Sequence, residues 1–140
     1  MSDGRRRGLF LTVMAVLFGV LALSNCTKAL QHLYGPKTLG IVIFGVRFER
    51  VLANVILGPL MGVVLGAYSY GLWNRRPWVA PLSIAYAFYV PANLVLFWYF
   101  QTGPEVPPLS FLVIYLAVAL TGSIATALYL AYHHDKLASA

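Results

Sequence analysis

The sequence predicts an all-α integral membrane protein, built as an antiparallel bundle of four helices. Four apolar stretches support this fold class, because each has the roughly 20 residues that an α-helix needs to cross about 30 Å of hydrocarbon. They are residues 8–29, 51–73, 78–100 and 109–132. Composition agrees, since 60% of the 140 residues are hydrophobic and only 10% are charged, whereas soluble domains carry about 25% charged residues. We therefore expect a single membrane domain over 1–140.

The basic residues lie near the ends of the predicted spans, so a formal net charge of +6 does not indicate a nucleic-acid-binding surface. If all four helices cross the bilayer, six Lys and Arg residues share one side and four share the other. The larger group is Arg5, Arg6, Arg7, Arg75, Arg76 and Lys136, and the smaller is Lys28, Lys37, Arg47 and Arg50. Because Lys and Arg are enriched on the cytoplasmic side, we expect both termini in the cytoplasm, in the inner membrane of a bacterium.

The first outer loop contains an apolar run, 41–44, that is too short to cross the membrane. We expect a short interfacial or re-entrant segment near 39–48, either strand-like or part of a helix. Arg47, Glu49 and Arg50 follow this run and most simply anchor the second span at headgroup level. A site for an anionic lipid headgroup at these residues is the alternative.

Only residues 74–77 separate the second and third spans. So short a link predicts a tight antiparallel helical hairpin, because it cannot reach a distant helix. Trp73 and Trp78 flank the link, as expected for aromatic rings at headgroup depth. The segment 71–78 resembles the inner hairpin of many small bacterial four-helix membrane proteins. This resemblance concerns membrane topology and implies no functional residue.

A stripe of glycines at four-residue spacing lines one face of the second span: Gly58, Gly62 and Gly66. Such a glycine zipper lets helix backbones approach closely in lipid, because no side chain keeps them apart. The fourth span carries a softer version at the same spacing: Ala119, Ser123, Ala127 and Ala131. We favour packing of the second and fourth spans against each other within one molecule. An interface between subunits is the alternative.

Two asparagines, Asn54 and Asn93, fall at comparable depth in the outer halves of the second and third spans. Pro59 and Pro91 lie near them, and proline removes a helix hydrogen bond and can kink the helix. Transporters build mid-membrane sites from polar groups beside broken helices, so Asn54 and Asn93 are candidates for a ligand site. The interpretation we favour is that each asparagine bonds a neighbouring helix or a carbonyl that proline has freed.

Residues for catalysis, for metal binding or for a cofactor do not stand out, and we expect none of the three. No ionisable residue falls clearly inside a span, which argues against ion-coupled transport. His133 and His134 are adjacent, so on a helix they would point about 100° apart and converge poorly on one metal ion. His32 is a lone histidine in the outer loop. Cys26 is the only cysteine, so it has no partner for an intrachain disulfide.

The segment 23–26 also resembles a bacterial lipobox, whose cysteine is lipidated after cleavage. Asn25 departs from that motif, which requires a very small residue at this position. We therefore favour an uncleaved first span.

Three functional hypotheses follow. The favoured one is a non-enzymatic accessory or structural subunit that packs in the lipid bilayer against a protein partner or as a homo-oligomer. The second is a small transporter, or a protein that binds a lipid or hydrophobic ligand, with its site near Asn54 and Asn93. The third and least favoured is an enzyme acting on a lipid or quinone at the outer face, which would use the region 25–50. A membrane-facing pocket over Lys28, His32, Arg47 and Glu49 would favour it.

Overall fold

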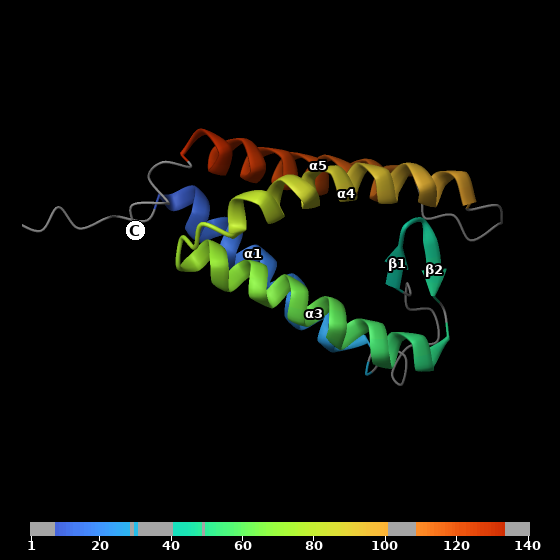
Figure 1. Cartoon of the computed structure of the whole chain (residues 1–140). Coiled ribbons are helices and arrows are strands. Elements are labelled where there is room, and N and C mark those ends of the chain that lie inside the picture. Colours follow the sequence, from blue (N-terminus) through green and yellow to red (C-terminus); the bar gives the residue numbers. More distant parts are fainter. Residues whose placement is uncertain (1–7, 29, 31–40, 49, 101–108, 134–140) are drawn as a thin grey trace, which may run out of the picture.

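The computed structural model describes residues 8–28, 30, 41–48, 50–100 and 109–133 (Figure 1). This part of the chain forms α1 (Leu9–Cys26), β1 (Ile41–Ile43), β2 (Val46–Phe48), α3 (Val51–Trp73), α4 (Val79–Phe100) and α5 (Leu109–Tyr132). The helical fold predicted from the sequence is confirmed. All four helices coincide with the predicted apolar stretches to within three residues at each end.

Three of the described helices, α1, α3 and α4, are long and apolar enough to cross a membrane, judged by length and composition. In α5, the apolar stretch among the residues with described side chains covers only 119–132. The structure is therefore compatible with a small membrane protein. That all four helices cross the bilayer stays a prediction.

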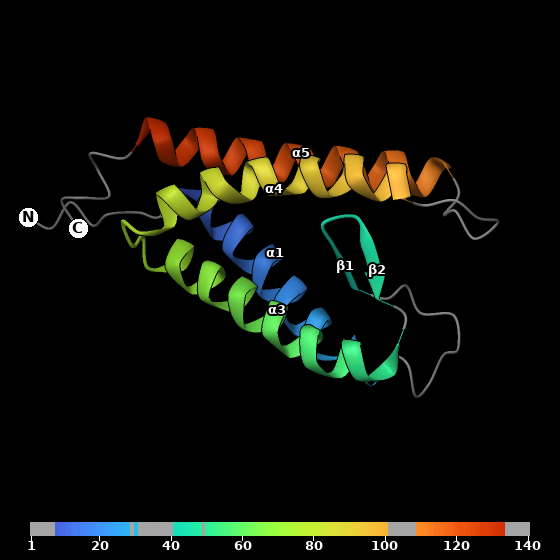
Figure 2. The same ribbon diagram turned by 45° about the vertical axis from the view of Figure 1, so that its right-hand side comes forward.

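The helices associate as two antiparallel pairs, α1 with α3 and α4 with α5 (Figures 1 and 2). The two pairs converge near the turn between α3 and α4 and diverge toward the opposite end, where the β-hairpin lies between them (Figures 1 and 2). The expectation of a tight α3–α4 hairpin is therefore met only next to the turn. Farther along, each helix packs against another neighbour, because the β-hairpin separates the two pairs.

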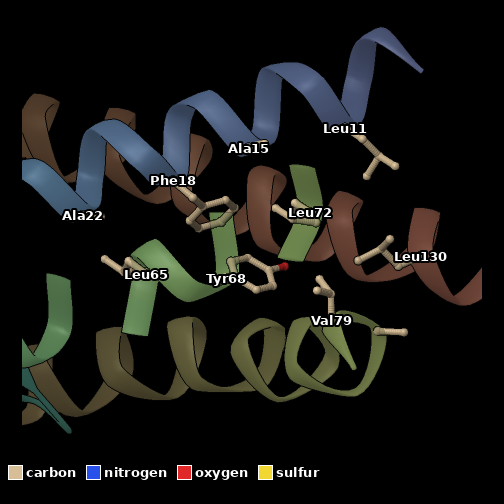
Figure 3. Packing of buried hydrophobic residues seen from close by; sticks show 10 residues of the cluster. Leu11, Ala15, Phe18, Ala22, Leu65, Tyr68, Leu72, Val79 and Leu130 are labelled. Carbon is tan, nitrogen blue, oxygen red and sulfur yellow. The ribbon is translucent and has the colours of Figure 1, made fainter. Parts of the chain in front are cut away.

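The main apolar cluster lies toward the converging end of the two pairs (Figure 3). Side chains from all four helices contribute to it, including Leu11 of α1, Leu72 of α3, Val79 of α4 and Leu130 of α5. Each of these four is less than 5% exposed. In lipid such close packing stabilises helix association through van der Waals contact, because apolar burial itself contributes little there. The cluster therefore joins the two helix pairs where they converge.

Candidate functional site

Residues 41–48 form a β-hairpin, which the sequence predicted only in part. β1 and β2 pair antiparallel, with Ile41 opposite Phe48 and Ile43 opposite Val46. Phe44 and Gly45 form the turn, with φ values of 47° and 78°. Two successive positive φ values are what a type I′ turn requires, and this turn matches the twist of the strands. Of the conformations expected near 39–48, the strand-like one is observed for 41–43.

Asn54 binds the open end of the hairpin from the first turn of α3. Its Oδ1 accepts a hydrogen bond of 3.0 Å from the Ile41 amide, and its Nδ2 donates one of 2.7 Å to the Phe48 carbonyl. A third bond, of 3.0 Å, runs from Nδ2 to the Arg50 carbonyl. One side-chain amide thereby bridges both strands and ties them to the start of α3. Asn54 is fully buried, so water does not compete for these bonds.

Asn93 of α4 binds the opposite end, at the turn. Its Oδ1 accepts a 2.8 Å hydrogen bond from the Gly45 amide. Gly45 is buried against the backbone of α4, and a β-carbon built on it would run into Leu96 and Phe97. The residue at this position must therefore be glycine for two reasons, its positive φ and the close approach of α4.

The two predicted polar residues thus bond to one element, the β-hairpin, and a ligand site near them stays a prediction. Asn54 and Asn93 each bind backbone groups of the hairpin, which lies between α3 and α4. This agrees in part with the favoured interpretation, since both asparagines bond the chain itself. Their partner is the hairpin instead of a neighbouring helix or a carbonyl that proline has freed. Arg47, another candidate, lies half-buried on β2 opposite Val42, whereas Glu49 and His32 lie outside the described residues.

Aromatic rings connect the hairpin turn to the apolar cluster. Phe44 meets Tyr89 edge-on at 5.3 Å between ring centroids, and Tyr89 lies 6.2 Å from Tyr86. Tyr86 in turn lies 5.5 Å from Phe18 and 5.9 Å from Tyr68. Two of these pairs, Phe44–Tyr89 and Phe18–Tyr86, are edge-to-face, and such pairs each add about 1 kcal/mol beyond their burial. The sequence analysis missed this series, because its rings come from four different elements. Only Tyr86 and Tyr89 lie one helical turn apart in the sequence, both on α4.

The glycine stripe of α3 packs against α1. A β-carbon built on Gly58 would lie 2.7 Å from the Asn25 carbonyl oxygen, and one built on Gly62 would collide with the Cys26 sulfur. Gly66 has more room, with its nearest neighbour, the Ala22 β-carbon, at 3.8 Å. Packing within one molecule is therefore observed, but the expected partner, the fourth span, is wrong.

A polar bond reinforces the same helix pair. The Ser69 hydroxyl of α3 donates a 2.6 Å hydrogen bond to the Ala15 carbonyl of α1. A β-carbon built on Gly19 would lie 3.3 Å from the Ser69 hydroxyl oxygen, so this part of α1 also approaches α3 closely. The sequence analysis missed Gly19 and Ser69, although both are small residues of the type that membrane helices place at their contacts.

Of the four small residues spaced by four along α5, three lie at least partly inside the protein and Ala131 is exposed. Ser123 and Ala127 are buried and Ala119 is half-buried. The Ser123 hydroxyl donates to the Leu120 carbonyl at 3.2 Å, and the Thr126 hydroxyl donates to the Gly122 carbonyl at 2.6 Å. Both bonds stay within α5, which packs mainly along α4.

Groups suited to chemistry are scarce in the described part of the chain. There, no three His, Cys, Asp or Glu side chains come together as metal ligands. Cys26 is exposed at the end of α1 and has a free thiol. His133 stacks on Tyr129 at 4.4 Å and shares a 2.9 Å hydrogen bond with the Tyr129 carbonyl, at the end of α5. In the described residues, the hairpin, Asn54 and Asn93 form a hydrogen-bonded unit that lies between the two helix pairs.

No protein-family model matches this chain, and no curated protein or solved structure matches it either. The class of protein therefore follows from the structure alone. Three long apolar helices are compatible with a small membrane protein.

Proposed function

We propose that the chain is a four-span integral membrane protein with a structural role, an accessory subunit that packs beside a protein partner or a second copy of itself. One observation carries this proposal: polar side chains inside the helices bond to backbone groups of the same chain. Asn54, Ser69 and Asn93 do so between elements. Polar groups used in this way act as internal ties, which supports a scaffold over a site that binds and releases a ligand.

The proposal takes α5 as the fourth span. α5 has 24 residues and at 1.5 Å per residue is about 36 Å long, which is sufficient for a hydrocarbon layer of about 30 Å. It runs antiparallel to α4, which is itself apolar enough to cross a membrane. With four spans both termini share one side, and the distribution of Lys and Arg supports the cytoplasmic side of a bacterial inner membrane.

Large apolar side chains on the outer faces of the helices supply the surface for such a partner. Val63 of α3 is 68% exposed and Phe88 of α4 is 74% exposed. Since Gly58 and Gly62 already pack against α1, a partner would contact side chains such as these and not the glycine stripe.

The test is the mass of the complex purified gently in detergent from its own membranes, with every co-purifying chain identified. A stoichiometric partner or a dimer supports the accessory-subunit proposal, and a bare monomer overturns it. Topology is tested separately, by labelling single cysteines placed at each terminus and in the α3–α4 turn from one side of sealed vesicles. Four spans require all three positions to react from the same side.

A second candidate is a small transporter or a protein that binds a hydrophobic ligand at the hairpin. The observation that favours it is the uneven attachment of the hairpin, which has two hydrogen bonds with Asn54 but one with Asn93. Release of the turn from α4 would expose Asn93 to a ligand. A bound small molecule in the native mass spectrum of the monomer, lost in Asn93→Leu and kept in Asn74→Leu, would support this candidate.

A further inference from the structure

The turn between α3 and α4 places an arginine where helices usually place glycine. The Arg76 amide donates to the Gly71 carbonyl at 2.9 Å and the Arg75 amide donates to the Leu72 carbonyl at 3.3 Å. This pair of bonds is the Schellman motif, in which the residue after the C-cap adopts a left-handed conformation. Arg75 occupies that position with a φ of 52°. A β-carbon is unfavourable there, so arginine is an unusual residue at this position.

Neither arginine of this turn has a hydrogen bond or an ion pair through its guanidinium within the described part of the chain. The Nε atom of Arg75 is buried and has no hydrogen-bond partner there, and Arg76 is exposed. A guanidinium presents five N–H donors in a planar fork, which suits the oxygens of a phosphate group. Two adjacent forks without acceptors among the described residues suit an anion such as a phosphate group.

Two tryptophans set the depth of these arginines relative to a bilayer. Trp73 and Trp78 flank the turn, with exposed fractions of 42% and 43%. The Trp78 ring is held over Gly71, because a β-carbon built on Gly71 would lie 2.7 Å from a carbon of that ring. Partly exposed tryptophans at helix ends belong to the headgroup region. The guanidinium groups beside them would then lie at the level of lipid phosphates.

We propose that Arg75 and Arg76 bind the phosphate group of an anionic phospholipid in the leaflet that surrounds the α3–α4 turn. The inference rests on the membrane insertion proposed above and adds a specific lipid contact to it. Charge supports the anionic lipid, since the net charge is +6 and the three arginines 5–7 stand just before α1 in the sequence. The start of α1 lies at this same end, where Leu11 and Val79 share the apolar cluster (Figure 3).

The experiment uses the two tryptophans of the turn as the probe. Trp98→Phe removes the third tryptophan of the chain, which lies near the opposite end of α4. This protein is reconstituted in two kinds of phosphatidylcholine vesicle. One contains phosphatidylglycerol brominated near the headgroup, and the other contains the same mole fraction of phosphatidylcholine brominated at the same position. We expect brominated phosphatidylglycerol to quench tryptophan fluorescence more strongly, with a binding preference of about fivefold for each arginine near the surface.

Variants then assign the preference to the turn. Arg75→Gln with Arg76→Gln should abolish it, and Arg50→Gln, an exposed arginine before α3, should leave it unchanged. Arg75→Gly with Arg76→Gln is a second test that keeps the turn conformation, because glycine adopts the positive φ of residue 75 without strain. Retention of the preference in either double variant overturns the proposal.

Two further outcomes separate the lipid site from membrane insertion. Equal quenching by both brominated lipids overturns the lipid site and leaves insertion supported, whereas quenching by neither overturns both. Competition by millimolar inorganic phosphate in the vesicle assay would indicate a site for a free anion and would also overturn the proposal.

Discussion

Asn54 and Asn93 bind opposite ends of the same β-hairpin, although α3 and α4, which carry them, approach each other mainly near the turn that joins them. Asn54 holds the open end, through the Ile41 amide and the Phe48 carbonyl, and Asn93 holds the Gly45 amide at the turn. The hairpin therefore acts as a spacer between the α1–α3 pair and the α4–α5 pair. The hydrogen bonds that attach the spacer to each pair can be removed one residue at a time.

Asn54→Leu removes the amide that bridges the strands while keeping a side chain of similar size. It leaves the Ile41 amide and the Phe48 carbonyl without this partner. Because each buried polar group without a partner costs about 1–3 kcal/mol, we expect the free energy of unfolding to fall by about 3 kcal/mol. The measurement is reversible unfolding in mixed detergent micelles.

Asn74→Leu is the matched control for this substitution. Asn74 is exposed and its side chain makes one bond, to the Tyr70 carbonyl, at the end of α3. We expect a loss within about 0.5 kcal/mol, as is usual for surface substitutions. Equal effects at Asn54 and Asn74 would contradict a bridging role for Asn54.

Gly45→Ala should release the hairpin turn from α4. The new methyl group would meet the backbone of α4 at Leu96 and Phe97, and the φ of 78° is unfavourable for alanine. We expect faster hydrogen exchange at the amide of residue 45, because its bond to Asn93 is lost. The helices should stay folded, since their own hydrogen bonds do not involve this residue.

Phe44→Gly changes the neighbouring turn residue and should leave the turn attached to α4. Glycine accepts the φ of 47° without strain, and the substitution removes the ring contact with Tyr89. The Gly45 amide should therefore stay protected from exchange. Loss of protection in Phe44→Gly to the same extent as in Gly45→Ala would show that the ring, and not the close backbone approach, holds the turn.

Lys28 should titrate below the ordinary lysine range. It follows α1, and its half-burial lowers its pKa from 10.5, because burial disfavours the charged form. The unfolded chain then binds more protons than the folded protein between the lowered pKa and 10.5. This contribution to stability therefore increases as the pH rises through that window and is lost as the pH falls.

Acylation of Lys28 at a series of pH values, read by peptide mass spectrometry, measures this shift. The same lysine in the denatured protein is the reference. We expect the midpoint of the labelling curve to be lower in the folded protein, and identical midpoints would contradict the effect of burial.

Sequence patterns were sufficient for the helices, because a span of about 20 apolar residues has few alternatives to helix in a membrane. They were insufficient for the contacts between helices. The four helices are apolar all round, so their hydrophobicity does not indicate which face meets which neighbour. The stripe at Gly58 and Gly62 correctly indicated a close contact but not that α1 was the partner.

The hairpin illustrates the same division. Three β-branched residues, 41–43, followed by Phe44 and Gly45 contain the local signal for strands and a turn with positive φ. The sequence predicted that Asn54 and Asn93 would form hydrogen bonds within the chain, but not which element they would bond. Their common partner depends on the distance that the tertiary fold leaves between α3 and α4, which no local pattern encodes.

A series of glycine-to-alanine substitutions along the helices tests whether the stripe serves the fold of one molecule. Alanine favours a helix over glycine by about 1 kcal/mol, so Gly122→Ala, where a β-carbon meets nothing within 4 Å, should leave stability unchanged or raise it. Gly66→Ala should behave similarly, because its nearest neighbour lies at 3.8 Å. Gly58→Ala and Gly62→Ala should each destabilise by about 2 kcal/mol, as overpacking does.

Both the unfolding free energy and the mass of the detergent-solubilised protein should be measured for each member of the series. A stripe that packs only against α1 predicts that Gly62→Ala lowers stability while the oligomeric state of the folded fraction stays the same. The reverse result, an altered oligomer at unchanged stability, would show that Gly62 lies between subunits. Because Gly66→Ala changes the same stripe one turn farther along without a steric conflict, it separates the effect of crowding from that of altering the stripe.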